Sequence, residues 1–145
     1  MGKALLVYAT RTGETKTQAE LIAEGIRMEG HEAEMVNVTT IKKEAALEGF
    51  DALVLGSATY HGEMMQGMKT MLFLAEKADL KGKAGGSFGA FGWSGEAPGR
   101  IFDTMKNIFK MDMVKGPLRL KSASLGGGTK MAQDYGREIA KKIGS

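Results

Sequence analysis

The sequence of 145 residues contains no cysteine, only two prolines and only two histidines, His31 and His61. A chain without cysteine can form no disulfide, no thiol nucleophile and no cysteine-ligated metal or iron–sulfur centre. The two histidines stand far apart in the sequence, so we expect no metal site. The sequence also lacks a signal-peptide pattern at its start and any apolar run near the roughly eighteen residues of a membrane-spanning helix. We therefore expect a cytoplasmic protein that does not contact a membrane.

The length and composition predict one domain spanning residues 1–145. Hydrophobic residues make up 43% of the chain and charged residues 26%, which is typical of a soluble globular protein with a sizeable core.

The net charge of +3 conceals an asymmetry, because residues 81–145 carry 12 basic side chains against 5 acidic ones. We interpret the excess as a solvated face rather than a nucleic-acid surface, since charge without a matching motif is weak evidence.

Strand-like apolar runs alternate with segments of helical periodicity along the whole chain. The predicted strands are 4–8, 31–38, 51–56, 87–92 and 113–122. The predicted helices lie at 16–29, 41–49, 64–75, 98–109 and 129–143. This alternation predicts an α/β fold with a doubly wound, five-stranded parallel sheet and helices on both faces.

The loops after the first, third and fourth strands are the candidate ligand-binding segments, because such sheets bind ligands beyond the carboxyl ends of their strands. The first loop, Thr10 to Thr15, joins a strand to a helix and carries hydroxyl groups and one glycine. The unpaired N–H groups and the dipole of a helix start attract anions. We interpret the loop as a phosphate cradle, and the alternative is a helix merely capped by Thr12 or Thr15.

The other two loops each carry an aromatic residue, Tyr60 after the third strand and Trp93 after the fourth. Aromatic rings beside a phosphate cradle suit a flat, conjugated ligand with a phosphate tail, such as flavin mononucleotide (FMN). Each ring alone could equally be a core or loop anchor.

Other ligand motifs are absent from these loops. The first turn lacks the lysine of a Walker motif and the glycines of a dinucleotide fingerprint. A phospho-receiver domain needs carboxylates where this chain has Thr10 and Ser57. His61 has no nucleophile nearby in a context that would suggest a catalytic triad.

The turn Thr10-Arg11-Thr12-Gly13-Glu14-Thr15 resembles the phosphate-binding motif of flavodoxins, and the βα pattern covers that family's whole fold. The segments 92–97 and 115–121 are similar to the flavodoxin-like domain of flavodiiron (A-type) flavoproteins. The resemblance implies a flavodoxin-like sheet of order 2-1-3-4-5 with an unbroken fifth strand, as in short-chain flavodoxins. It also implies FMN held non-covalently and electrons passed one or two at a time to protein partners.

Transferred position by position, the resemblance implies a phosphate loop and two loops that hold the flavin ring, with no catalytic residue and no metal ligand. The phosphate loop comprises Thr10, Arg11, Thr12, Gly13, Glu14 and Thr15. The ring loops comprise Ser57, Ala58, Thr59, Tyr60, His61 and Gly62, and then Phe91, Gly92, Trp93 and Gly95.

The sequence departs from the family pattern in three ways. His61 stands where many flavodoxins have glycine, and a backbone flip to positive φ is harder there. This predicts either weaker stabilisation of the one-electron-reduced flavin or a shift of the glycine's role to Gly62. The loops mix basic and acidic residues in place of an acidic collar, which predicts a partner surface less basic than usual. The chain also lacks the His-rich and carboxylate-rich metal domain of flavodiiron proteins, so oxygen or nitric oxide reduction is not expected of it alone.

We expect a monomeric electron carrier that exchanges electrons with a reductase and an acceptor protein. One alternative is an NAD(P)H-dependent flavin or quinone oxidoreductase on the same scaffold, although such enzymes usually need longer loops than these. The other is a regulatory or binding module that has lost the flavin.

Overall fold

The computed structural model describes residues 2–10, 13–60, 63–90, 96–120 and 127–143. Its main sheet contains β1 (Lys3–Ala9), β2 (Glu32–Asn37), β3 (Ala52–Ser57), β6 (Ala84–Ala90), β7 (Asp112–Met113) and β8 (Leu118–Leu120). All these strands pair in parallel in the order β2-β1-β3-β6-β7, and β8 also pairs with β6. The predicted order 2-1-3-4-5 is confirmed, with β7 and β8 together in the fifth place.

The fifth strand is divided, so the prediction that it runs unbroken is wrong. β7 pairs with the start of β6 and β8 with its end. The Val114 N–H still donates to the Gly85 carbonyl (3.1 Å), and the pairing is interrupted after it, at residues 115–117. Pro117 has no N–H to donate to a ladder. The Gly116 carbonyl instead accepts a hydrogen bond from the Tyr135 hydroxyl (2.7 Å).

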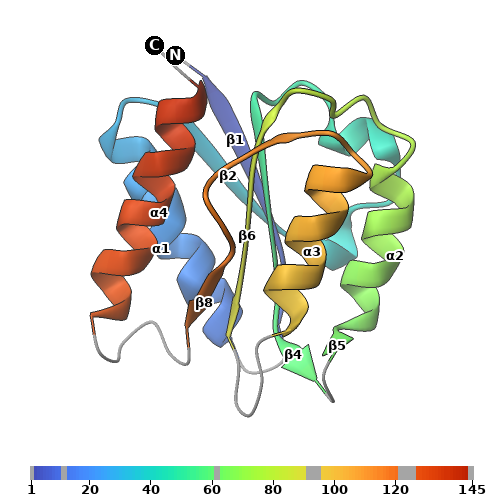
Figure 1. Cartoon of the computed structure of the whole chain (residues 1–145), viewed down its shortest axis with the longest axis horizontal. Helices are drawn as coiled ribbons and strands as arrows, with labels where there is room; N and C mark the ends of the chain where they lie inside the picture. Colours follow the sequence, from blue (N-terminus) through green and yellow to red (C-terminus); the bar gives the residue numbers. More distant parts are fainter. Residues whose placement is uncertain (1, 11–12, 61–62, 91–95, 121–126, 144–145) are drawn as a thin grey trace.

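The two faces of the sheet are covered by pairs of helices (Figure 1). Helices α1 (Glu14–Met28) and α4 (Gly128–Ile143) pack on one face, and α2 (Gln66–Ala75) and α3 (Glu96–Asn107) on the other. Glycines let α1 and α4 approach closely, because a Cβ at Gly25 would lie 2.0 Å from the Gln133 carbonyl oxygen. The central strands are buried on both sides, as expected for a parallel sheet.

The predicted helix at 41–49 is wrong: that segment contains only one short 3₁₀ turn, η2 (Glu44–Leu47), and another, η1 (Val38–Thr40), precedes it. The Asn37 side chain begins η1 by accepting a hydrogen bond from the Thr39 N–H (3.0 Å). Leu47 is fully buried against the α2 side of the sheet. Val38 in η1 is buried on the same side, so the two turns anchor this connection without a full helix.

A two-stranded antiparallel hairpin follows β3, where the sequence predicts only a loop. It consists of β4 (Thr59–Tyr60) and β5 (Glu63–Met64), and it lies at the same edge of the molecule as the start of α3 (Figure 1). Within the described ranges, no helix is long and apolar enough to span a bilayer.

Candidate flavin site

The turn after β1 is closed by its own side chain. The Thr10 hydroxyl oxygen accepts a hydrogen bond from the Gly13 N–H at 2.9 Å, which leaves the hydroxyl proton of Thr10 to donate elsewhere. Gly13 has a φ of +93°, and a Cβ there would meet nothing within 4 Å. Glycine is therefore favoured at this position by backbone conformation and not by lack of space.

Thr15 lies in the first turn of α1, immediately after this loop. Gly13, which has no side chain, occupies the N-cap position, so the alternative in which Thr15 is the cap is wrong. Thr12, the other candidate for the cap, lies outside the described residues. The Thr15 side chain is fully buried, and its hydroxyl oxygen has no hydrogen-bond partner. A buried hydroxyl without a partner costs free energy, which makes it a candidate ligand contact.

The start of α1 supplies the donors that an anion needs. The Thr17 N–H bonds back to the Gly13 carbonyl (3.0 Å), and the N–H groups of Thr15 and Lys16 lie in the first turn of the helix, where no carbonyl of the helix can accept from them. Together with the helix dipole and the Thr15 hydroxyl, they form a cradle for a phosphate-sized anion. The described residues of the phosphate loop therefore fit the phosphate of FMN.

Gln18 is a buried polar residue that the sequence analysis did not single out. It lies one turn after Thr15, its amide nitrogen is 3.4 Å from the Leu120 carbonyl oxygen, and its own amide oxygen has no partner. Gln18 lies on the face of α1 that carries mostly apolar residues. A polar residue at such a position is the sequence signal that could have identified it. Gln18 connects the first turn of α1 to the end of β8.

The loop after β3 is held at both ends. The Ala58 N–H donates to the Ala9 carbonyl (3.2 Å), which ties the loop to the end of β1. The buried Ser57 hydroxyl donates to the Ala58 carbonyl and accepts from the Met65 N–H, both at 2.9 Å. Ser57 therefore closes the base of the β4–β5 hairpin, and its hydroxyl has no proton left to donate to a ligand.

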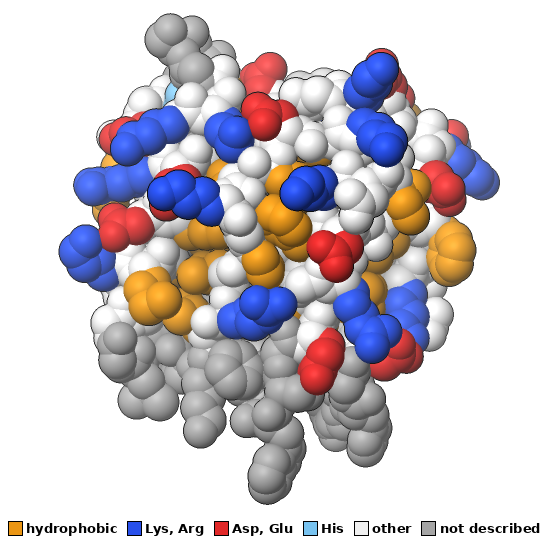
Figure 2. Space-filling model, in the orientation of Figure 1, with side chains coloured by type: hydrophobic (Ala, Val, Ile, Leu, Met, Phe, Trp, Pro, Cys, Tyr) orange, Lys and Arg blue, Asp and Glu red, His pale blue; other side chains and the backbone are white. Residues whose placement is uncertain are grey.

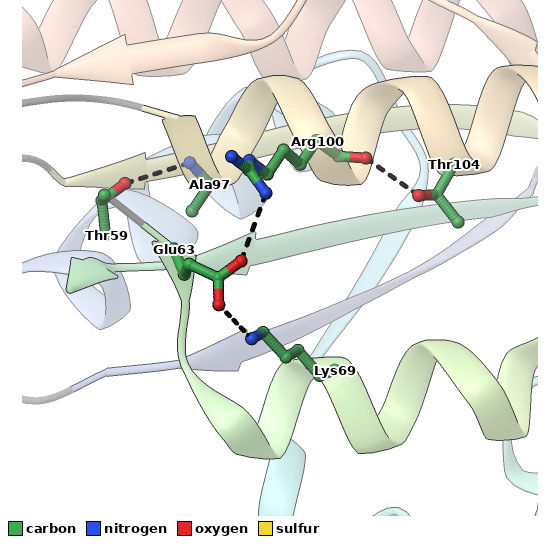
Figure 3. Close-up of polar contacts among 6 residues, drawn as sticks. All are labelled: Thr59, Glu63, Lys69, Ala97, Arg100 and Thr104. Carbon is green, nitrogen blue, oxygen red and sulfur yellow. Dashed lines mark hydrogen bonds and ion pairs between the residues drawn. The ribbon is translucent and has the colours of Figure 1, made fainter. Parts of the chain in front are cut away.

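Thr59 connects this loop to α3 (Figure 3). Its hydroxyl oxygen accepts a hydrogen bond from the N–H of Ala97 in the first turn of that helix, at 3.1 Å. Ala97 is fully buried, so Thr59 provides the partner that the helix start would otherwise lack. The two predicted ring loops are thereby linked through residues that flank them.

An ion-pair cluster lies beside the hairpin (Figure 3). The Glu63 carboxylate contacts the Lys69 ammonium at 2.5 Å and the Arg100 guanidinium at 3.2 Å. The hydrogen bond and charge of Lys69, followed by the charge of Arg100, lower the pKa of Glu63 below its ordinary value. The mixed charges predicted around the flavin are thus at least partly paired with one another.

The end of β6 packs tightly against β3 and α3. A Cβ at Gly89 would lie 2.1 Å from the Ser57 carbonyl oxygen and 2.9 Å from the Pro98 ring. The buried Ser87 hydroxyl donates to the Pro98 carbonyl at 2.7 Å. These contacts hold the start of α3 in place at the edge of the sheet where β1 and β3 also end.

The described site residues come together as predicted at one edge of the sheet, but half of the predicted set lies outside the described residues. That half comprises Arg11, Thr12, His61, Gly62, Phe91, Gly92, Trp93 and Gly95. Of Tyr60 only the backbone is described, paired with Glu63. Among the residues that the structure describes, no cluster of histidine and carboxylate side chains could hold a metal ion.

Residues 5–126 match the family model of the flavodoxin domain. The chain belongs to the flavodoxin family. It is 43% identical to a flavodoxin of Aquifex aeolicus over 66% of this chain and 54% of that protein. It is also 31% identical to the putative diflavin flavoprotein A 6 of a Nostoc species over 95% of this chain. The chain spans a quarter or less of the length of the cyanobacterial diflavin flavoproteins that it matches.

Solved structures agree with this assignment. A flavodoxin from the domain Archaea superposes with a TM-score of 0.91 over 99% of both chains, at 28% identity. The flavodiiron protein from Giardia intestinalis superposes with a TM-score of 0.86 over 97% of this chain but 36% of that one. The flavodoxin-like fold, the FMN cofactor and the electron-transfer function expected from the sequence are those of the family.

Proposed function

We propose that the chain is an electron carrier that holds FMN in the turn between β1 and α1 and between the loops that follow β3 and β6. The phosphate loop of this proposal is Thr10 to Thr15. The ring loops are residues 57–62 and residues 91, 92, 93 and 95. The carrier would work in the cytoplasm between a reductase and an acceptor protein, with one chain supplying every residue that contacts the flavin.

One observation carries the proposal more than any other. The Thr15 hydroxyl is buried at the start of a helix and has no protein partner. A bound phosphate would supply that partner and would lie where the helix dipole stabilises negative charge. The unpaired group is thus explained by a ligand of the chemistry that the family uses.

The residues of the chain bind and orient, while bound FMN supplies the redox chemistry. Thr10 shapes the phosphate loop by its bond to Gly13 and keeps a hydroxyl proton to donate. Ser57 and Thr59 fix the first ring loop against the hairpin base and against α3. A loop fixed in this way holds a ring in one orientation and limits the entry of water beside it.

The charges around the ring loops suit partners of modest charge. Glu63 is paired with Lys69 and Arg100, so the hairpin presents little net charge to an approaching protein. Electron-transfer rates should therefore fall less steeply with salt than those of a carrier with an acidic collar.

The proposal is tested by loading the protein with FMN and following its redox state. We expect tight binding, seen as quenching of flavin fluorescence, and oxidation of the chemically reduced protein by an added haem protein such as cytochrome c. NADH or NADPH alone should leave the yellow form unchanged.

Two results would contradict the proposal and identify the alternative. Rapid bleaching by NADH or NADPH alone would indicate the oxidoreductase on this scaffold. A protein that FMN neither colours nor stabilises against heat would indicate the flavin-free module.

A further inference from the structure

The face formed by α2 and α3 carries an apolar groove beside an exposed aromatic side chain. Phe73 is 73% exposed and Ile108 is 58% exposed. The groove has a volume of about 270 Å³. Its lining residues are Met64, Lys69, Leu72, Phe73, Glu76, Thr104, Ile108 and Phe109. On the side of the molecule where these helices lie, Figure 2 shows hydrophobic side chains at the surface among charged ones. Large exposed apolar side chains around a hollow are typical of an interaction surface.

The α2 wall of this groove is self-complementary. It consists of Lys69, Leu72, Phe73 and Glu76, which share one side of the helix at spacings of three and four residues. A positive side chain stands at one end, a negative one at the other, and two apolar side chains lie between them. An antiparallel copy, related by a two-fold axis between positions 72 and 73, would place Lys69 opposite Glu76 and Leu72 opposite Phe73.

Phe73 also stands between two hollows. The groove lies on one side of it, and a second depression of about 630 Å³, lined in part by Val38, Ile41 and Thr70, lies on the other. A two-fold interface joins the same patch on both subunits, so that patch must contain both the projection and the hollow that receives it. The α2 face meets this requirement.

We propose that the α2 face is the docking surface for a second copy of this chain, with the two α2 helices packed antiparallel. Phe73 of each copy fills the groove of the other, and Lys69 of each copy pairs with Glu76 of the other. The surface lies on the opposite side of the sheet from α1, so docking leaves the proposed phosphate loop uncovered. The proposal replaces the monomer expected from the sequence and is independent of the proposed function.

Sedimentation of the FMN-loaded protein over a range of concentrations tests this assignment. We expect a monomer–dimer equilibrium with a Kd of about 1 mM or tighter. Phe73→Glu should raise that Kd at least about 30-fold, the effect of removing an aromatic hot spot of about 2 kcal/mol. Met131→Glu is the matched control, because Met131 is 49% exposed but lies on α4, on the other face. It should leave the Kd unchanged.

A charge exchange tests the antiparallel arrangement itself. Lys69 also pairs with Glu63 of its own chain, so the exchange is made in a Glu63→Gln background to avoid a new clash there. Lys69→Glu or Glu76→Lys alone should weaken the dimer, and the two together should restore it.

Three results would overturn the proposal. The first is a wild-type chain that stays monomeric at about 1 mM, whether or not some other molecule covers the face. The second is a Phe73→Glu protein that dimerises like the wild type. The third is a double charge variant that dimerises no better than the single variants. All the substituted side chains lie at least partly at the surface, and the thermal midpoint of each variant checks that it is folded.

Discussion

The two sides of the proposed flavin site differ in how their polar groups are satisfied. On the ring side, the hydroxyls of Ser57, Thr59 and Ser87 each bond to the backbone of a neighbouring segment. On the phosphate side, Thr15 and Gln18 carry the only buried side-chain oxygens without a partner in the described part of the chain. Among the described residues, the buried side-chain hydroxyls of the ring side all have protein partners, whereas those of the phosphate side do not.

This difference indicates that the two sides contribute to flavin binding in different ways. Side chains that are already held by hydrogen bonds, such as Ser57 and Thr59, lose less conformational entropy when a ligand binds beside them. An unpaired buried hydroxyl costs about 1–3 kcal/mol, a cost that a bound phosphate would offset. The ring side therefore provides orientation, and the phosphate side provides affinity.

The largest expected effect comes from disturbing the packing on the ring side. Gly89→Ala would place a Cβ 2.1 Å from the Ser57 carbonyl oxygen and force β3 and β6 apart. Overpacking of this kind costs about 1–3 kcal/mol, which denaturant unfolding would measure. Gly116→Ala is the control, because a Cβ there would meet nothing within 4 Å. Equal losses of stability in the two variants would show that this contact is not tight.

A pair of Thr→Val substitutions should move stability in opposite directions in the FMN-free protein. Thr59→Val removes the partner of the Ala97 N–H and should cost about 1 kcal/mol. Thr15→Val removes a buried hydroxyl that has no partner and should stabilise the protein by about 1 kcal/mol. Denaturant midpoints of the two variants, measured side by side, check the signs. Destabilisation by both substitutions would remove the distinction between the two sides.

The smallest expected effect concerns the ion pairs of Glu63. Its pKa is lowered by Lys69 and then by Arg100 from the usual 4.5, so the stability it contributes is present above pH 4.5 and is lost as the pH falls through the lowered value. The stability difference between wild type and Glu63→Gln should therefore be larger at about pH 7 than at about pH 3. It should also shrink in high salt.

Urea unfolding at both pH values measures this difference. Glu48→Gln is the control, because it removes an exposed carboxylate that takes part in none of the ion pairs between described residues. A difference that grows on acidification would contradict the assignment.

Most of the fold follows from local patterns in the sequence. Apolar runs such as 51–56 predict buried parallel strands, and the structure has this one at Ala52–Ser57 in the predicted strand order. The division of the fifth strand could not be predicted from such patterns, because the alternation of apolar and polar residues around Leu118 continues through Pro117. The helix predicted at 41–49 does not form, because Val38 and Leu47, each buried in a short 3₁₀ turn, suffice to anchor that connection.

The candidate site was predicted in its location and only partly in its details. Residues at the ends of neighbouring parallel strands must meet, so the phosphate loop and the first ring loop could be placed together. The Thr59–Ala97 hydrogen bond and the Glu63–Arg100 ion pair join segments about 37 residues apart. Periodic patterns in the sequence describe single helices and strands, so they do not predict contacts over this separation. The unpaired oxygen of Thr15 also depends on burial by other elements.

The binding of FMN and of riboflavin to Thr15→Val is the most direct test of the division between the two sides. Riboflavin has the ring system but no phosphate, so it should bind the variant as it binds the wild type. FMN should bind at least about tenfold more weakly, because a hydrogen bond to a charged group contributes about 1.5 kcal/mol or more. Thr17→Val, which alters an exposed hydroxyl in the same turn, should change neither dissociation constant. An equal loss of affinity for both flavins, or no loss for FMN, would contradict the account.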